Sequence, residues 1–266
     1  MYSFVFHAHQ KVDRVAYKQL SVLLGPVALP MGISEILHFE GNRGPDAARL
    51  KKGDDEPPWH FYQPEGKNKQ FIEVITEHHD RLVKELVAGN RQHAAFDAAW
   101  LAHALVDGLT PAHHYPYEKE LEVIRRSDKQ TRHSICSHLL VHGDTARESI
   151  KASLKLIGPK GLLMTHTSFE AGASSIILSL NLAKTLPDSQ ELALLRQSSF
   201  IDIFESYARQ IEHLNMYKRF YKNGWTQALA RDIRLEAAPR MVRIVTLAWY
   251  SAILEAGRPK GEKLCV

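Results

Sequence analysis

One helical segment of the sequence places ionisable side chains among apolar ones. Between Trp100 and His113, His103 and Asp107 stand four residues apart, so both side chains lie on one face of the predicted helix. Their neighbours are alanine, leucine and valine, which puts this face in an apolar interior. An unpaired buried charge costs several kcal/mol or is neutralised, and a bound divalent cation resolves the conflict. Pro111 ends the helix and His113 follows it, so the segment predicts a metal site.

The composition narrows the class of protein. Of 266 residues, 44% are hydrophobic and 24% charged, as in soluble globular proteins with a sizeable core. The net charge of +4 is compatible with anionic substrates but too small to indicate nucleic-acid binding. Cys136 and Cys265 form no CxxC pair, so nitrogen and oxygen must hold any metal, and this usage suits a reducing compartment. Without a signal peptide or an apolar stretch long enough to span a bilayer, we expect a cytoplasmic protein with no transmembrane segment.

Helical periodicity recurs along nearly the whole chain and predicts an all-α fold, a multi-helix bundle with long ordered loops. Helices are expected at 9–24, 31–39, 71–87, 94–110, 134–157, 164–184, 190–215 and 226–257, the last kinked or broken near Pro239. Residues 40–69 are rich in Gly, Pro, Asp and Lys, which predicts a long ordered loop of the kind that is commonly functional. The charged segment 115–133 is interpreted as a surface excursion. We expect one domain over 1–266, with a metal-site core at 5–175 and helices in 176–266 completing the bundle.

Further histidines and carboxylates occur in an ordered series along the chain. His9 opens the first predicted helix, and Asp46 lies in the long loop after Gly-Pro. His60 follows within Pro-Trp-His-Phe-Tyr, and His166 and Glu170 form another pair spaced by four residues. A single pair of this kind is a weak signal, because it is often a structural hydrogen bond or a solvated helical pair. The order of the whole series is more specific.

In order, spacing and local chemistry, these elements resemble the zinc-dependent phospholipase C and single-strand-specific nuclease superfamily, over roughly residues 5–175. The resemblance implies an all-α phosphodiesterase with a trinuclear zinc cluster at the bottom of a cleft. It also implies a ligand set: one zinc is bound by Asp46, His60, His103 and Asp107; a second is bridged by Asp107 and held by His9; and a third is held by His113, His166 and Glu170.

The chemistry that the resemblance implies is phosphoester hydrolysis by a zinc-activated hydroxide. A bound zinc lowers the pKa of its water from about 15.7 to about 7, and a further zinc neutralises charge on the phosphoryl and leaving oxygens. Asp46 is also the candidate catalytic residue, which would orient or deprotonate the attacking water. Trp59, Phe61 and Tyr62 beside His60 are candidates for substrate binding, although aromatic residues next to a buried ligand are commonly core. The substrate could be a phospholipid headgroup, single-stranded nucleic acid or a small phosphoester.

Two features depart from the family pattern. In the family, an amino-terminal tryptophan freed by signal cleavage helps to ligate the zinc held by the first histidine. Here no tryptophan precedes His9, so we expect this zinc to be weakly bound, absent or ligated otherwise, with His7 the nearest substitute. The gap from His113 to His166 is also long, and it contains His138 and His142, a further candidate pair that we interpret as exposed or outside the ligand shell.

Three alternatives remain open at the level of sequence. The zinc ligands could staple a catalytically inactive helical binding module. Alternatively, the same ligands could hold iron or manganese in place of the two or three zinc ions that we expect, because geometry and availability decide the metal. His60, His79, Asp80 and Asp107 also follow the ligand order of HD-type phosphohydrolases. Against this last alternative, His78 and His79 stand among charged neighbours, which favours a surface position for both.

Overall fold

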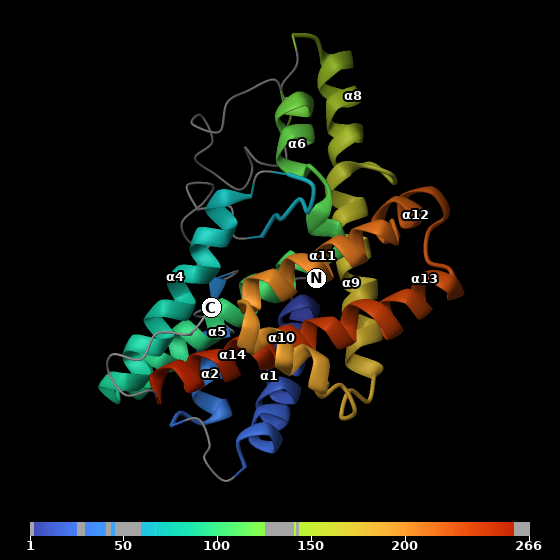
Figure 1. Ribbon diagram of the computed structural model, residues 1–266. Coiled ribbons are helices and arrows are strands. Elements are labelled where there is room, and N and C mark those ends of the chain that lie inside the picture. Colours follow the sequence, from blue (N-terminus) through green and yellow to red (C-terminus); the bar gives the residue numbers. More distant parts are fainter. Residues whose placement is uncertain are drawn as a thin grey trace.

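In the computed structural model, all regular elements of the described residues are helices, which confirms the all-α prediction (Figure 1). The residues that the structure describes are 3–25, 30–40, 44–45, 60–66, 68–125, 141 and 144–257. Much of the predicted 40–69 loop therefore lies outside the described residues. No helix among the described residues has both the length and the apolar character that crossing a membrane requires.

The helix that carries His103 and Asp107 lies at the centre of the fold. α5 (Arg91–Gly108) begins after Asn90, whose side chain accepts a hydrogen bond from the His93 amide. From Ala94 onward nearly every side chain of α5 is buried, and many of them are alanines. Alanine has the highest helix propensity and lets neighbouring helices approach closely, so a helix of this composition can be buried on all sides.

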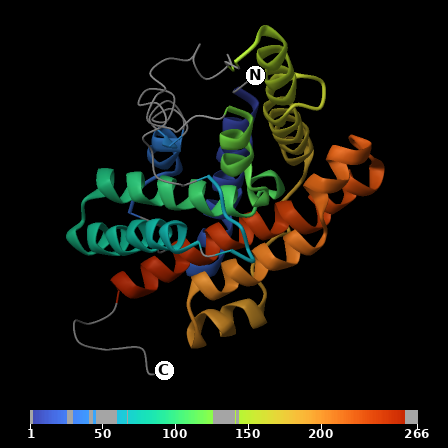
Figure 2. The same cartoon turned by 90° about the horizontal axis from the view of Figure 1, so that it is seen from above.

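Four helices pack around α5: α1 (Ser3–Leu24), α2 (Ile33–Glu40), α4 (Lys69–Ala88) and α14 (Ala238–Ala256). The last of these crosses the centre of the molecule in both overall views (Figures 1 and 2). Its Trp249 is fully buried and donates a hydrogen bond of 3.0 Å from Nε1 to the carbonyl oxygen of Ala98. One hydrophobic core runs from Ala8 in α1 to Ala252 in α14, so the C-terminal helices share the core that surrounds the site.

The C-terminal end of α5 is fixed by a contact that requires glycine. A Cβ atom on Gly108 would lie 2.6 Å from the ring of Phe204 in α11 (Phe200–His213) and 2.8 Å from the ring of Phe71 in α4. A larger residue would push these helices apart. The 3-10 helix η1 (Pro111–His114) then brings His113 back towards Asp107.

Two predicted helices are interrupted for identifiable reasons. The segment 190–215 forms α10 (Ser189–Gln197) and α11, because the Ser199 side chain accepts a hydrogen bond from the Asp202 amide and begins a new helix. Near Pro239, where the sequence predicts a kink or break, a π-helical turn, η3 (Ile233–Ala237), immediately precedes α14. Proline has no amide N–H for the preceding turn and its ring crowds the carbonyl four residues earlier, which disfavours regular α-helix there.

Five further helices complete the described part of the molecule. They are α6 (Tyr117–Arg125), α8 (Ala146–Ile157), α9 (Leu162–Ser179), α12 (Met216–Asn223) and α13 (Gln227–Asp232). α6 and α8 pack against each other and project from the body of the molecule (Figure 1). α8 continues through a short turn into α9, which carries His166 and Glu170. The predicted surface excursion at 115–133 is described only as far as α6.

Candidate metal centre

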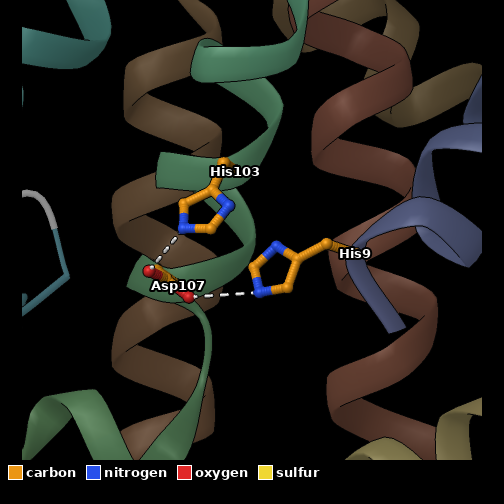
Figure 3. Close-up of side chains that lie close together, drawn as sticks. All are labelled: His9, His103 and Asp107. Carbon is orange, nitrogen blue, oxygen red and sulfur yellow. Dashed lines mark ion pairs between the residues drawn. The ribbon is translucent and has the colours of Figure 1, made fainter. Parts of the chain in front are cut away.

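A cluster of imidazoles and carboxylates lies at the C-terminal half of α5. Its members come from α1, α2, α5, η1, α9 and the segment before α4. Every imidazole of this cluster is at most 8% exposed, although histidine is frequently found at protein surfaces. Figure 3 shows His9 reaching from α1 towards His103 and Asp107 of α5. The cluster consists of His9, Glu40, His60, His103, Asp107, His113, His166 and Glu170.

Asp107 occupies the middle of the cluster and presents each carboxylate oxygen to a different pair of histidines. Its Oδ2 lies 2.5 Å from His60 Nδ1 and 3.2 Å from His103 Nε2. Its Oδ1 lies 3.3 Å from His9 Nε2 and 3.5 Å from His113 Nδ1. A carboxylate that bridges two cations needs this division of its oxygens between two sets of ligands.

Glu40, at the C-terminal end of α2, holds two of these imidazoles from the opposite side. Its Oε1 lies 2.9 Å from His103 Nδ1 and 3.7 Å from His9 Nδ1, and the two rings are stacked with centroids 4.3 Å apart. An ionised carboxylate only accepts hydrogen bonds, so Nδ1 of His103 donates to Glu40. In the neutral ring, the lone pair is then on Nε2, which faces Asp107. Carboxylates commonly orient metal-binding histidines in this way.

Replacing Glu40 by glutamine is expected to weaken metal binding at the group of His9, His103 and Asp107 by roughly 10–100-fold. The amide is neutral and can turn its NH₂ group towards the histidines, so it no longer fixes the imidazole tautomer. Competition with a chromogenic chelator measures this affinity. Glu35→Gln is the matched control, because Glu35 is on the same helix but pairs with Arg91 at the surface. If Glu40→Gln binds metal as tightly as the control, Glu40 does not orient these ligands.

His113, His166 and Glu170 form a second group beside the first. Glu170 Oε1 lies 2.8 Å from His113 Nε2 and 3.0 Å from His166 Nε2. The two rings are nearly parallel, with centroids 5.3 Å apart. Because the other ring nitrogen of His113 faces Asp107, this residue joins the two groups. The ring of Phe61 lies against both His113 and His166.

The two central carboxylates are held in their ionised forms. Burial opposes ionisation of Asp107, but the adjacent His113 and His103 imidazoles and a hydrogen bond from His60 bring its pKa well below the ordinary value. Burial likewise opposes ionisation of Glu170, and His166 and His113 lower its pKa below the ordinary value. Buried anions are stable only when cations compensate them, either protonated histidines or metal ions.

The donor atoms could hold metal ions. In each group, ligand atoms from three residues lie within 4.8 Å of one another. Ligand atoms at 2.0–2.1 Å from a tetrahedral zinc are separated by about 3.3 Å. His9 and His103 lie 3.3 and 3.2 Å from Asp107, close to that spacing, whereas His113 and His166 lie 2.8 and 3.0 Å from Glu170, at hydrogen-bond distance. Two buried groups of this protein could therefore hold metal ions, on nitrogen and oxygen ligands alone.

The structure brings together seven of the eight predicted ligands. Asp46, the eighth, lies outside the described residues, as do Trp59, His138 and His142. His9 is buried in the cluster whereas the side chain of His7 is exposed, which decides between these neighbours.

The aromatic residues beside His60 have different environments. Phe61 is half-buried and stacks on Tyr117, whose ring also contacts His166. Tyr62 is 2% exposed and packs against the rings of Phe71 and Phe204. This packing makes Tyr62 a core residue and gives its predicted role in substrate binding no support, whereas Phe61 stays beside the second group.

The predicted surface position of His78 and His79 is wrong. His78 is 2% exposed, and its Nδ1 lies 2.8 Å from Asp97 Oδ1. His79 is 4% exposed, lies 3.2 Å from the Ser251 hydroxyl and stacks on Phe200. The charged neighbours misled the prediction, because they lie on the outer face of α4. The HD arrangement gains no support, since the Asp80 side chain is 72% exposed and faces solvent rather than a buried ion.

Two acidic residues near the site are absent from the predicted set. Asp13 is 1% exposed, and burial and the nearby Glu40 raise its pKa well above the ordinary value. Its spacing of four residues from His9 repeats the spacing of the other two histidine–carboxylate pairs, so the sequence carried a signal for it. Glu40 had no such signal, because only the packing of α2 against α5 and α1 brings it to the histidines.

His114, next to the second group, predicts a measurable pH dependence of stability. Its Nε2 donates to the Gly108 carbonyl oxygen at 2.9 Å, and burial lowers its pKa from 6.5 to about 4. The unfolded chain therefore takes up a proton at this histidine at a higher pH than the folded chain does. Stability should fall as the pH drops from about 6.5 to about 4, with a loss of about 3 kcal/mol from this group.

Urea unfolding in the presence of a chelator, repeated at several pH values, checks this expectation. The wild-type chain should lose about 3 kcal/mol more than His114→Gln over the acid range. The chelator keeps metal release from contributing to the slope. Equal slopes for the two proteins would show that His114 titrates normally in the folded chain.

Comparisons with models of protein families, with curated proteins and with solved structures found no match for this chain.

Proposed function

We propose that this protein is a zinc-dependent phosphoester hydrolase. The observation that carries the proposal is the division of the Asp107 oxygens between two histidine pairs, next to the group of His113, His166 and Glu170, which shares His113 with one of these pairs. Multinuclear sites of this kind suit displacement at phosphorus, because closely spaced metal ions stabilise both the attacking and the leaving oxygen. The resemblance of the ligand series to the phospholipase C and nuclease superfamily supports the same assignment.

Each residue has a defined part in this proposal. One ion would be held by His60, His103, Asp107 and Asp46. A second would be held by His9 and Asp107, and a third by His113, His166 and Glu170. When bound, zinc supplies a water of lowered pKa and positive charge for phosphoryl oxygens. Glu40 keeps His103 in the tautomer that presents Nε2, and Asp107 keeps the two ligand groups in register. Asp46 would orient the attacking water.

A small cavity reaches these ligands. It has a volume of about 30 Å³ and is lined by His9, Asp107 and Glu170 together with residues of α9, η3 and α14. A cavity measured in this way needs roughly 10–15 Å³ to hold one water molecule, so this one has room for water beside the ligands. Catalytic zinc sites differ from structural ones in keeping one coordination position for water. The cavity supports the catalytic interpretation.

Hydrolysis assays on the metal-saturated protein test the proposal. Bis-p-nitrophenyl phosphate, single-stranded DNA and phosphatidylcholine micelles represent the three substrate classes. We expect hydrolysis of at least one of them, loss of the activity with a chelator, and recovery when zinc is restored. Parallel recovery assays with manganese and iron identify the metal. If metal-saturated protein hydrolyses none of the three, the hydrolase assignment is wrong.

The burial of the ligands favours a second candidate function. In it, the protein is a binding module whose fold the metal ions stabilise, and it has no catalytic activity. Structural zinc sites are closed, and every histidine of this site is nearly inaccessible. Asp46→Asn separates the two candidates. A hydrolase loses turnover by orders of magnitude while most of its zinc is retained, whereas a stapled module has no turnover to lose and changes only in stability.

A further inference from the structure

The projecting helix α8 exposes a row of aliphatic side chains to solvent. Ile150, Leu154 and Ile157 are 61%, 57% and 45% exposed, and their spacing of four and three residues puts them on one face. Leu156 is fully buried on the inner face, where α8 packs against α6 and α9. Packing within the described part of the molecule therefore explains the inner face of α8 but not the outer one.

A row of basic side chains runs beside the aliphatic row. Arg147, Lys151 and Lys155 are all exposed and follow one another at intervals of four residues. Among the residues that the structure describes, no carboxylate forms an ion pair with these three. Lys160, also exposed, continues the positive charge past the end of the helix. The outer face of α8 thus combines an apolar row with an uncompensated positive row.

We infer that the outer face of α8 is a docking surface for anionic lipid membranes. Helices that lie in a membrane interface insert aliphatic side chains among the acyl chains and hold Lys and Arg at the level of the headgroups. Positive charge complements the negative potential of a membrane that contains anionic lipid.

This surface is connected to the metal centre through the chain. α8 ends at Ile157, and α9, which begins at Leu162, carries His166 and Glu170 one and two turns further on. Docking through α8 would therefore hold the membrane at the helix that directly precedes α9. The inference rests on the exposed face of α8 and not on the proposed hydrolysis, so membrane binding and turnover of a soluble phosphodiester can fail separately.

Co-sedimentation with vesicles tests the inference on the full chain. The probes are vesicles of phosphatidylcholine alone and vesicles of phosphatidylcholine mixed in equal parts with phosphatidylserine. We expect binding to the mixed vesicles, weaker binding to phosphatidylcholine, and a marked loss at high salt. Lys151→Gln with Lys155→Gln should weaken binding about 25-fold, since each basic side chain near an anionic surface changes affinity about fivefold. Ile150→Gln with Leu154→Gln should weaken binding at least about tenfold.

Matched controls separate this face from general surface effects. Lys218→Gln with Lys222→Gln removes two exposed lysines at the same spacing on α12, and Leu194→Gln removes an exposed leucine on α10. These variants should bind vesicles as the wild type does. Absence of binding to either vesicle, or equal loss in the control variants, overturns the inference. It is also overturned if sedimentation shows an oligomer that dissociates in Leu154→Gln, because a second copy of the chain would then cover this face.

Discussion

Replacing Asp107 by asparagine is expected to lower turnover of a phosphodiester by at least about a thousandfold. Each carboxylate oxygen of Asp107 faces a different pair of histidines, at 2.5–3.5 Å. An amide keeps the shape but removes the negative charge and offers only one acceptor oxygen, so it cannot serve both pairs. Steady-state assays with bis-p-nitrophenyl phosphate, with metal content measured on the same samples, check the expectation. The variant should also retain less metal.

Asp97→Asn provides a control on the same helix. Asp97 is also buried and pairs with a histidine, His78, at 2.8 Å, but it lies outside both ligand groups. This variant should lose stability, because the buried contact with His78 is weakened, and keep its metal content and turnover. If Asp107→Asn retains near-normal turnover, or if both variants lose it equally, Asp107 is not the residue on which the metal centre depends.

Removing the metal ions should lower the melting temperature by about 10 °C. A ligand present at a thousand times its dissociation constant stabilises the folded chain by about 4 kcal/mol, and 1 kcal/mol corresponds to roughly 2–4 °C for a chain of this size. Without metal, the buried carboxylates of Asp107 and Glu170 must be compensated by protonated histidines. Thermal unfolding followed by circular dichroism, with and without a chelator, measures the shift.

The double variant Asp107→Asn with Glu170→Gln is the control for this shift. It removes the charged ligand from each group, so the chelator should change its melting temperature far less than it changes that of the wild type. Addition of zinc should restore the wild-type value and leave the variant unchanged. A wild-type melting temperature that does not respond to the chelator means that the imidazole–carboxylate network is a purely structural hydrogen-bond network.

Helices with local sequence signals could be predicted from the sequence alone. α5 is predictable from its alanines, its histidine–carboxylate pair on one face and the proline that follows it. Ser199 and Asp202 form a capping box that marks the break between α10 and α11, although the periodicity of 190–215 alone suggested one helix. The histidine–carboxylate pairs were recognisable because both partners stand on one helix face.

Residues whose role depends on packing between helices could not be predicted in the same way. Glu40 meets His103 across 63 positions in the chain, and only the contact of α2 with α5 brings them together. His78 was assigned to the surface from its charged neighbours, yet the structure turns it inward onto Asp97. A polar residue on a helix can be buried when the adjacent helix supplies a hydrogen-bond partner. Which residue becomes that partner depends on the tertiary structure.

The most direct test of the metal centre is a crystal structure of the zinc-saturated protein with diffraction measured on both sides of the zinc absorption edge. Anomalous difference density should appear at the two oxygens of Asp107, beside His60 and His103 and beside His9, and again between His113, His166 and Glu170. Density at either group should disappear when its carboxylate is replaced by the amide. An ordered, zinc-saturated crystal without anomalous density at these two groups would contradict the assignment of a metal centre.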